Sequence, residues 1–84
     1  MRDIDRVTYE VRDRVPMWVV YRPVTTDFPG QWVGRLHLSL PVPTATEWHV
    51  TGETLEAVRA QLPEWLSVLP RSDADAPVIE EVWF

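Results

Sequence analysis

The sequence contains no cysteine, no lysine and only three glycines among its 84 residues. Without cysteine it can form neither disulfides nor thiolate metal sites. No apolar run is long enough for a membrane-spanning helix, and residues 1–5 are too charged to begin a secretory signal. The three glycines occur singly and form no phosphate-binding loop. We therefore expect a cytoplasmic protein that does not associate with a membrane.

The composition is that of one small globular domain over residues 1–84, with 45% hydrophobic residues and five tryptophans. The net charge of −5 is unevenly distributed. Residues 47–84 hold eight acidic residues and two arginines, whereas acids and arginines balance over residues 1–14. This acidic second half lacks the basic footprint of a nucleic-acid-binding surface, so we expect no direct nucleic-acid contact. It favours solubility and permits a basic protein partner.

Four segments have the composition and boundaries of β-strands: residues 17–22, 31–40, 47–51 and 78–84. The first is apolar on both faces, which predicts a strand with neighbours on each side. Pro29 and Gly30 are typical of a type II turn, so the first two strands should form an antiparallel hairpin. The alternation of the second and third strands predicts that these side chains face the core: Trp32, Leu36, Leu38, Leu40, Trp48 and Val50. The alternation of the last strand does not decide its inner face.

Residues 55–69 carry the one long helical pattern. Apolar side chains recur at a spacing that places them on one helix face: Leu55, Val58, Leu62, Trp65, Leu66 and Leu69. Thr54 or Thr51 can cap the N-terminus of this helix. Pro63 lies inside the pattern, so we expect either a kink or a break that begins a second short helix. Of these two, the kink is preferred because the apolar face continues beyond Pro63.

Residues 1–14 alternate, with Val7, Tyr9 and Val11 on one face, which predicts an N-terminal strand or, failing that, a frayed arm. The expected fold class is α+β, a mostly antiparallel sheet of four to five strands with one kinked helix packed on one face. The expected order is β-β-β-β-α-β. Residues 71–76 should form an exposed loop.

No catalytic, cofactor or metal signature is present, so we expect neither enzyme activity nor a bound cofactor. His37 and His49 do not have the H-E-x-x-H spacing of a zinc protease, and no serine lies in a nucleophile elbow. The least favoured alternative is a minimal metal-dependent hydrolase. That activity would need these side chains in one pocket: Asp27, Glu47, His49 and Glu81.

Five tryptophans are more than a small two-layer domain readily buries. We expect Trp48 and Trp65 to fill the core. Interface hot spots are enriched in tryptophan and arginine, which favours tryptophans on the first and last strands for contact with another chain. The candidate partner interface consists of Trp18, Arg22, Arg35 and Trp83.

Residues 50–57 resemble a segment of the HicB-like antitoxin family, in which a strand ends in a Gly-Asp-Thr-Leu-Glu-Glu-Ala type turn that begins a helix. The residues that carry the resemblance are Gly52, Thr54, Leu55, Glu56 and Ala57. Residues 30–36 are similar to that family's second strand, and the resemblance covers about residues 17–84. It implies a partly degenerate ribonuclease-H-like fold without the catalytic acids, often dimeric, that binds a small toxin.

We therefore expect a non-enzymatic protein-interaction domain that acts by self-association as a homodimer. The resemblance adds a protein partner, with a small basic toxin as its candidate class. The alternative from a different class is a structural module of phage or mobile-element origin with no separate biochemical activity.

Overall fold

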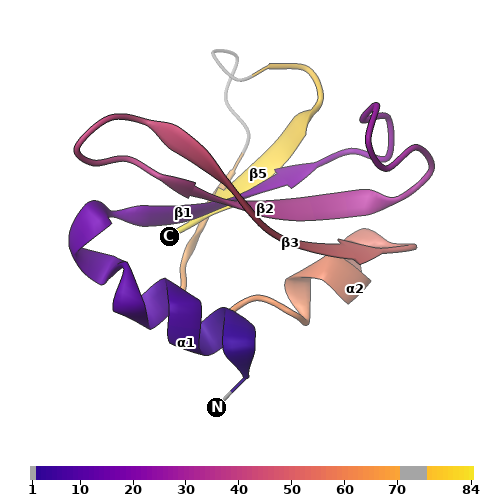
Figure 1. The fold of residues 1–84 in the computed structure, drawn as a ribbon. Coiled ribbons are helices and arrows are strands. Elements are labelled where there is room, and N and C mark those ends of the chain that lie inside the picture. The colour runs from indigo at the N-terminus through magenta and orange to yellow at the C-terminus, as the bar shows by residue number, and fades with distance from the viewer. Residues whose placement is uncertain (1, 71–75) are drawn as a thin grey trace.

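The computed structural model describes residues 2–70 and 76–84 of the chain (Figure 1). Its elements in chain order are α1 Asp3–Glu10, the 3₁₀-helix η1 Arg12–Arg14, β1 Pro16–Tyr21, β2 Trp32–Leu38, β3 Thr44–Gly52, α2 Leu55–Arg59, β4 Val68–Pro70 and β5 Ile79–Trp83. The α+β class is confirmed, but the order of the elements differs from the prediction. The predicted loop over residues 71–76 falls, except for Ala76, outside the described residues. Neither helix in the described part of the chain has the length and apolar character needed to cross a membrane.

The five strands described form one antiparallel sheet in the order β3-β2-β1-β5-β4. β1 is central, as its apolar residues on both faces predict. The β1–β2 hairpin is confirmed, with Trp18 opposite Leu36. The loop of this hairpin contains the expected tight turn, because Gly30 has a φ of 82° and the N–H of Gln31 donates to the carbonyl of Phe28.

Both α-helices pack on one face of the sheet, the lower face in Figure 1. The core on this side is formed by Val7, Trp18, Val20, Leu36, Leu38, Val50, Val58 and Leu62. Val19 and Val33 are also buried but point to the opposite face, because they alternate with core residues along their strands. The β1–β2 loop packs over part of that face, where Asp27 of the loop forms an ion pair with Arg35 of β2.

The predicted N-terminal strand is wrong, because this segment forms α1 and η1. Ile4, Val7 and Val11 lie at helical spacing and pack in or against the core. Pairs of charged residues three or four positions apart also suit a helix: Arg2 with Asp5, Arg6 with Asp3, and Arg6 with Glu10. The alternation of Val7, Tyr9 and Val11 fits a strand equally well, and Ile4 is the apolar residue that favours the helix.

The predicted helix over residues 55–69 is wrong beyond Arg59. α2 ends there, and Pro63 neither kinks a longer helix nor begins another. Proline has no N–H to donate to the carbonyl of Arg59, and it disfavours the helical conformation at Leu62. The chain then runs into β4, which pairs with β5. Strand pairing therefore replaces the helical path that the apolar spacing of residues 65–69 indicates.

The start of α2 is as predicted. Thr54 is the N-cap, and its Oγ1 accepts a hydrogen bond of 3.1 Å from the N–H of Ala57. Gly52 permits the close approach of the helix to the end of β3, because a Cβ added there would lie 2.8 Å from the Cβ of Ala57. A cap and a glycine thus specify the strand-to-helix turn locally.

Candidate functional site

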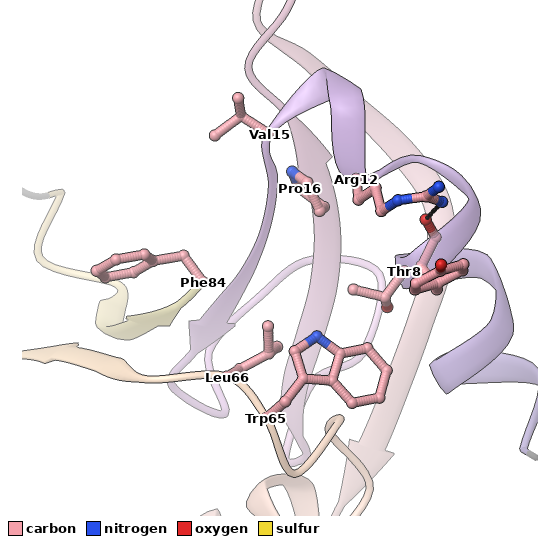
Figure 2. Close-up of a pocket in the computed structure, with 8 residues that line it drawn as sticks. Thr8, Arg12, Val15, Pro16, Trp65, Leu66 and Phe84 are labelled. Atoms are coloured by element: carbon pink, nitrogen blue, oxygen red, sulfur yellow. Dashed lines mark hydrogen bonds between the residues drawn. The ribbon is translucent and has the colours of Figure 1, made fainter.

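An apolar groove lies between the C-terminal part of α1 and the segments that lead into β4 and out of β5 (Figure 2). α1 and η1 contribute Thr8, Tyr9 and Arg12, and the chain at the start of β1 contributes Val15 and Pro16. The remaining lining residues are Trp65, Leu66 and Phe84. The volume of the groove is about 630 Å³, within the range of roughly 300–1,000 Å³ that is usual for binding sites.

Four large side chains of the groove are about half exposed: Tyr9, Val15, Trp65 and Phe84, at 53, 47, 55 and 53%. Single exposed apolar residues are ordinary, but a contiguous group around a concave surface marks a contact site. Full burial of a side chain such as phenylalanine contributes about 1.5–3 kcal/mol. A partner that covered these side chains would gain part of that free energy at each of them.

Arg12 lies at one end of the groove. Its guanidinium carbon is 3.9 Å from the centroid of the Tyr9 ring, and its Nη1 donates to the Tyr9 carbonyl at 2.9 Å. Among the arginines that the structure describes, only Arg12 and Arg14 have no carboxylate partner. Arg12 is therefore the one charged side chain among those that line the groove, and it has no ion-pair partner among the described residues.

A smaller depression beside the groove is lined by Arg2, Asp5, Glu64 and Trp65. Arg2 forms an ion pair with Asp5 at 3.1 Å. Glu64 is exposed and has no ion-pair partner within residues 2–70 and 76–84. Because Trp65 lines both depressions, Arg12 lies in the groove itself, and Glu64 lies in the depression that adjoins it at Trp65, where it also interacts electrostatically with Arg2.

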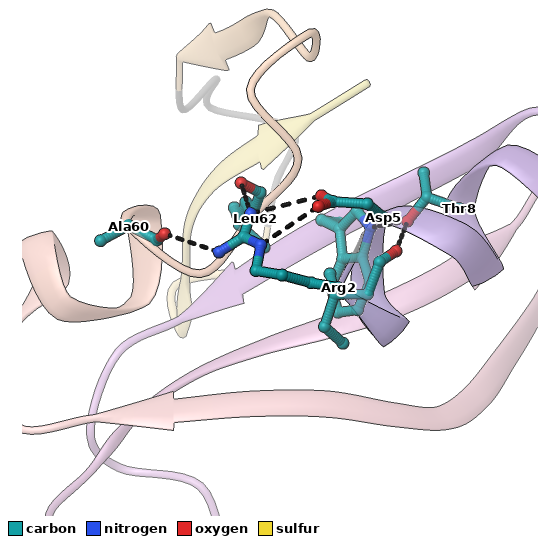
Figure 3. A network of polar contacts seen from close by, with 7 residues as sticks. Arg2, Asp5, Thr8, Ala60 and Leu62 are labelled. Atoms are coloured by element: carbon teal, nitrogen blue, oxygen red, sulfur yellow. Dashed lines mark hydrogen bonds and ion pairs between the residues drawn. The ribbon is translucent and has the colours of Figure 1, made fainter.

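Two sets of polar contacts hold α1 as a wall of the groove. Arg2 donates to the carbonyls of Ala60 and Leu62 at 3.2 and 3.1 Å, just after α2 (Figure 3). Ala60 is the C-cap of α2, where carbonyls lack intrahelical partners, and Leu62 lies two residues further along the chain. Within the core, Nε1 of Trp18 donates to Oγ1 of Thr8 at 3.0 Å. The position of the groove is therefore set by the packed fold.

The predicted interface residues Trp18, Arg22, Arg35 and Trp83 do not form one surface. Trp18 is fully buried beneath α1 and belongs to the core, so it does not lie at the surface of the described chain. Trp83 is opposite Trp18 in the sheet and packs against the core. Arg22 forms an ion pair with Glu80, and Arg35 is ion-paired on the sheet face away from the helices.

The predictions for Trp48 and Trp65 are also wrong, because these side chains are 39% and 55% exposed. Trp48 belongs to a bulge, in which residues 46–48 of β3 stand opposite the single residue Leu36 of β2. Trp65 follows Pro63, after the helix that would have turned it inward has ended. Pro63 is thus the sequence signal for an exposed Trp65.

The side chains of the alternative hydrolase site are not brought together. Glu81 lies on the helix-covered face, where it binds Arg59. Asp27 and His49 lie on the opposite face of the sheet. Arg35 is on that face, and it forms an ion pair with Asp27 and stands opposite His49 in the sheet. Within the described ranges, no three His, Cys, Asp or Glu side chains are grouped so that they could hold a metal ion.

Comparison of the chain with protein-family models, with curated proteins and with solved structures finds no match. The candidate site is therefore defined by its geometry and chemistry.

Proposed function

We propose that this chain is a non-enzymatic protein-interaction domain that acts by self-association and by binding a protein partner, with the apolar groove as its contact surface. The observation that carries the proposal is the grouping of Tyr9, Arg12 and Trp65 around one concave surface. Tyrosine, arginine and tryptophan are the residue types most enriched at interface hot spots. Exposure of these half-buried aromatic rings to water is unfavourable, and a partner that covers the groove would remove it.

A protein surface suits this groove better than a nucleic acid does. The net charge of the chain is −5, and Arg12 is the one charged residue in the groove lining. Binding to a phosphate backbone ordinarily needs a basic patch. The contact is therefore mainly apolar, with one charge to orient the partner.

The resemblance of residues 50–57 to HicB-like antitoxins supplies a candidate partner class, a small basic toxin. Exposed acidic side chains that have no ion pair in the described part of the chain support a basic partner whose contact extends beyond the groove lining. They are Glu47, Glu53 and Glu56, on β3 and at the start of α2. Such a charge distribution speeds the encounter with a basic protein. Co-purification with the product of an adjacent gene for a small basic protein tests this part of the proposal.

Affinity capture with the whole chain and its Trp65→Ser variant tests the use of the groove. Trp65 is 55% exposed, so the variant should keep the thermal unfolding midpoint of the wild type while capturing less partner and self-associating less. Val24→Ser is the matched control, because Val24 is 69% exposed and does not line the groove. Equal capture by the wild type and Trp65→Ser, together with a strictly monomeric mass for both, would contradict the proposal.

A further inference from the structure

We propose that the groove is occupied by a second copy of this chain, related by a two-fold axis that places Arg12 of each copy opposite Glu64 of the other. This inference rests on the proposed function, because it takes the groove as the contact surface, and it adds the partner and its orientation. The positive charge of Arg12 in the groove and the net negative charge of the adjoining depression around Glu64 carry it.

These charges have opposite sign and are separated along α1. Arg12 lies just beyond the C-terminal end of the helix, and Glu64 lies beside Asp5 near its N-terminal end. Asp5 belongs to the first turn of α1, whereas Arg12 begins η1 after the end of that helix. Arg2 forms an ion pair with Asp5 and also interacts electrostatically with Glu64, so the two acids and one arginine leave one net negative charge at this end.

A two-fold axis across the groove reverses its direction in the second copy. The positive end of each copy then meets the negative end of the other, so the same patch is complementary to itself, as a two-fold interface requires. Trp65, which lines both depressions, lies in the middle of this contact. The arrangement gives two equal ion pairs around one apolar centre.

The edges of the sheet are less suited to joining two copies. In β3 the bulge at residues 46–48 interrupts the regular row of backbone groups. β4 is only three residues long and ends at Pro70, which has no N–H to donate. In the part of the chain that the structure describes, each outer strand therefore carries a feature that opposes strand-to-strand association, and contact through side chains at the groove is favoured.

A dimer through this face would have to bury more surface than the groove lining alone. An ordinary dimer buries about 800 Å² of each partner, roughly 15% of the 5296 Å² accessible here. Val68 extends the apolar surface beyond the groove, since it is 46% exposed and stands opposite Trp83 on the helix-covered face.

Charge reversal with rescue tests the orientation. Sedimentation equilibrium of the whole chain over micromolar to submillimolar concentrations should show a concentration-dependent dimer. Arg12→Glu and Glu64→Arg each convert two attractive contacts into repulsive ones, so each should weaken the dimer by about tenfold or more. The double variant R12E/E64R restores attraction and should return the dimer constant toward the wild-type value.

Glu47→Arg is the matched control, because it makes the same charge change at an exposed site on β3. It should leave the dimer constant unchanged, and circular dichroism of every variant checks that the fold is kept. This check matters for both reversals, because Arg12 binds the Tyr9 carbonyl and Glu64 interacts electrostatically with Arg2.

A wild-type chain that stays monomeric at every concentration would overturn this inference. The proposed function would survive that result if Trp65→Ser still lost a captured partner. A dimer that is insensitive to both reversals, or one that the double variant does not restore, would overturn the pairing of Arg12 with Glu64.

Discussion

The indole Nε1 of Trp18 donates a hydrogen bond of 3.0 Å to Oγ1 of Thr8, and the two residues are 0% and 2% exposed. The Thr8 hydroxyl in turn donates to the carbonyl of Ile4 at 2.7 Å. The bond joins the central strand to α1 and satisfies a polar group that would otherwise be buried without a partner. It explains how a tryptophan on a strand that is apolar on both faces becomes part of the core.

Thr8→Val should therefore lower the free energy of unfolding by about 1–3 kcal/mol, the cost of leaving the buried indole N–H without an acceptor. Valine keeps the shape of threonine, so packing changes little. Urea unfolding followed by circular dichroism measures the difference. Thr8→Ser keeps the acceptor and should cost only about 0.8 kcal/mol for the lost methyl group. A Thr8→Val variant as stable as the wild type would show that the bond contributes nothing.

Glu81 should make stability depend on pH. It is 4% exposed and accepts hydrogen bonds from Arg59 at 3.0 and 2.6 Å, and one from the indole of Trp83. The bonds from Arg59 hold the pKa of Glu81 below its ordinary value, although burial opposes this shift. Because the folded pKa is the lower one, the stabilisation is complete above the unfolded pKa of about 4.3 and is lost as pH falls through the folded value.

Glu81→Gln should consequently flatten the decline of stability below about pH 4.3. Urea midpoints measured at a series of pH values for the wild type and the variant check this. Glu53→Gln is the control, since Glu53 is exposed and has no ion pair in the described part of the chain. Parallel pH profiles for wild type and Glu81→Gln would contradict the assignment.

Gly52→Ala should destabilise the fold by about 1–3 kcal/mol through overpacking. The added Cβ would lie 2.8 Å from the Cβ of Ala57 and 3.2 Å from the backbone nitrogen of Val58, so α2 itself would have to move. Gly30→Ala is the comparison, because it has a φ of 82° but no atom within 4 Å. Its cost of about 1 kcal/mol reflects backbone strain alone. Thermal unfolding of both variants tests whether Gly52→Ala is the more destabilising.

Thr54→Ala should cost about 1 kcal/mol, because it removes the acceptor for the N–H of Ala57 at the first turn of α2. Thr54→Ser retains the acceptor and should stay close to the wild type. The comparison is made by urea unfolding. If both substitutions had the same effect, the side-chain cap would not be what stabilises the start of this helix.

The features that the sequence alone determined are those with local signals. Proline boundaries and apolar residues on both faces indicate β1, and Pro29 with Gly30 indicates the turn of the hairpin. Gly52 and Thr54 indicate the start of α2. Each depends on backbone conformations and hydrogen bonds within a few residues, so no distant partner is needed to read it.

The groove could not be predicted in this way. Its walls come from segments whose apolar spacing fits both a helix and a strand. The spacing alone predicts a strand around Tyr9 and a continued helix at Trp65. Arg12 is notable only because it remains unpaired after five other described arginines have formed ion pairs. That property belongs to the assembled fold.

The tertiary structure alone decided which tryptophans are buried. The segment around Val7 forms a helix that packs over Trp18 of β1. Residues 68–70 form a strand that pairs with the edge of β5. Trp18 is thereby enclosed, while Trp65 stays at the surface. An apolar pattern indicates which side chains a helix or strand can bury. The residues that pack against those side chains lie far away in the sequence, so only tertiary packing selects among the conformations that the pattern allows.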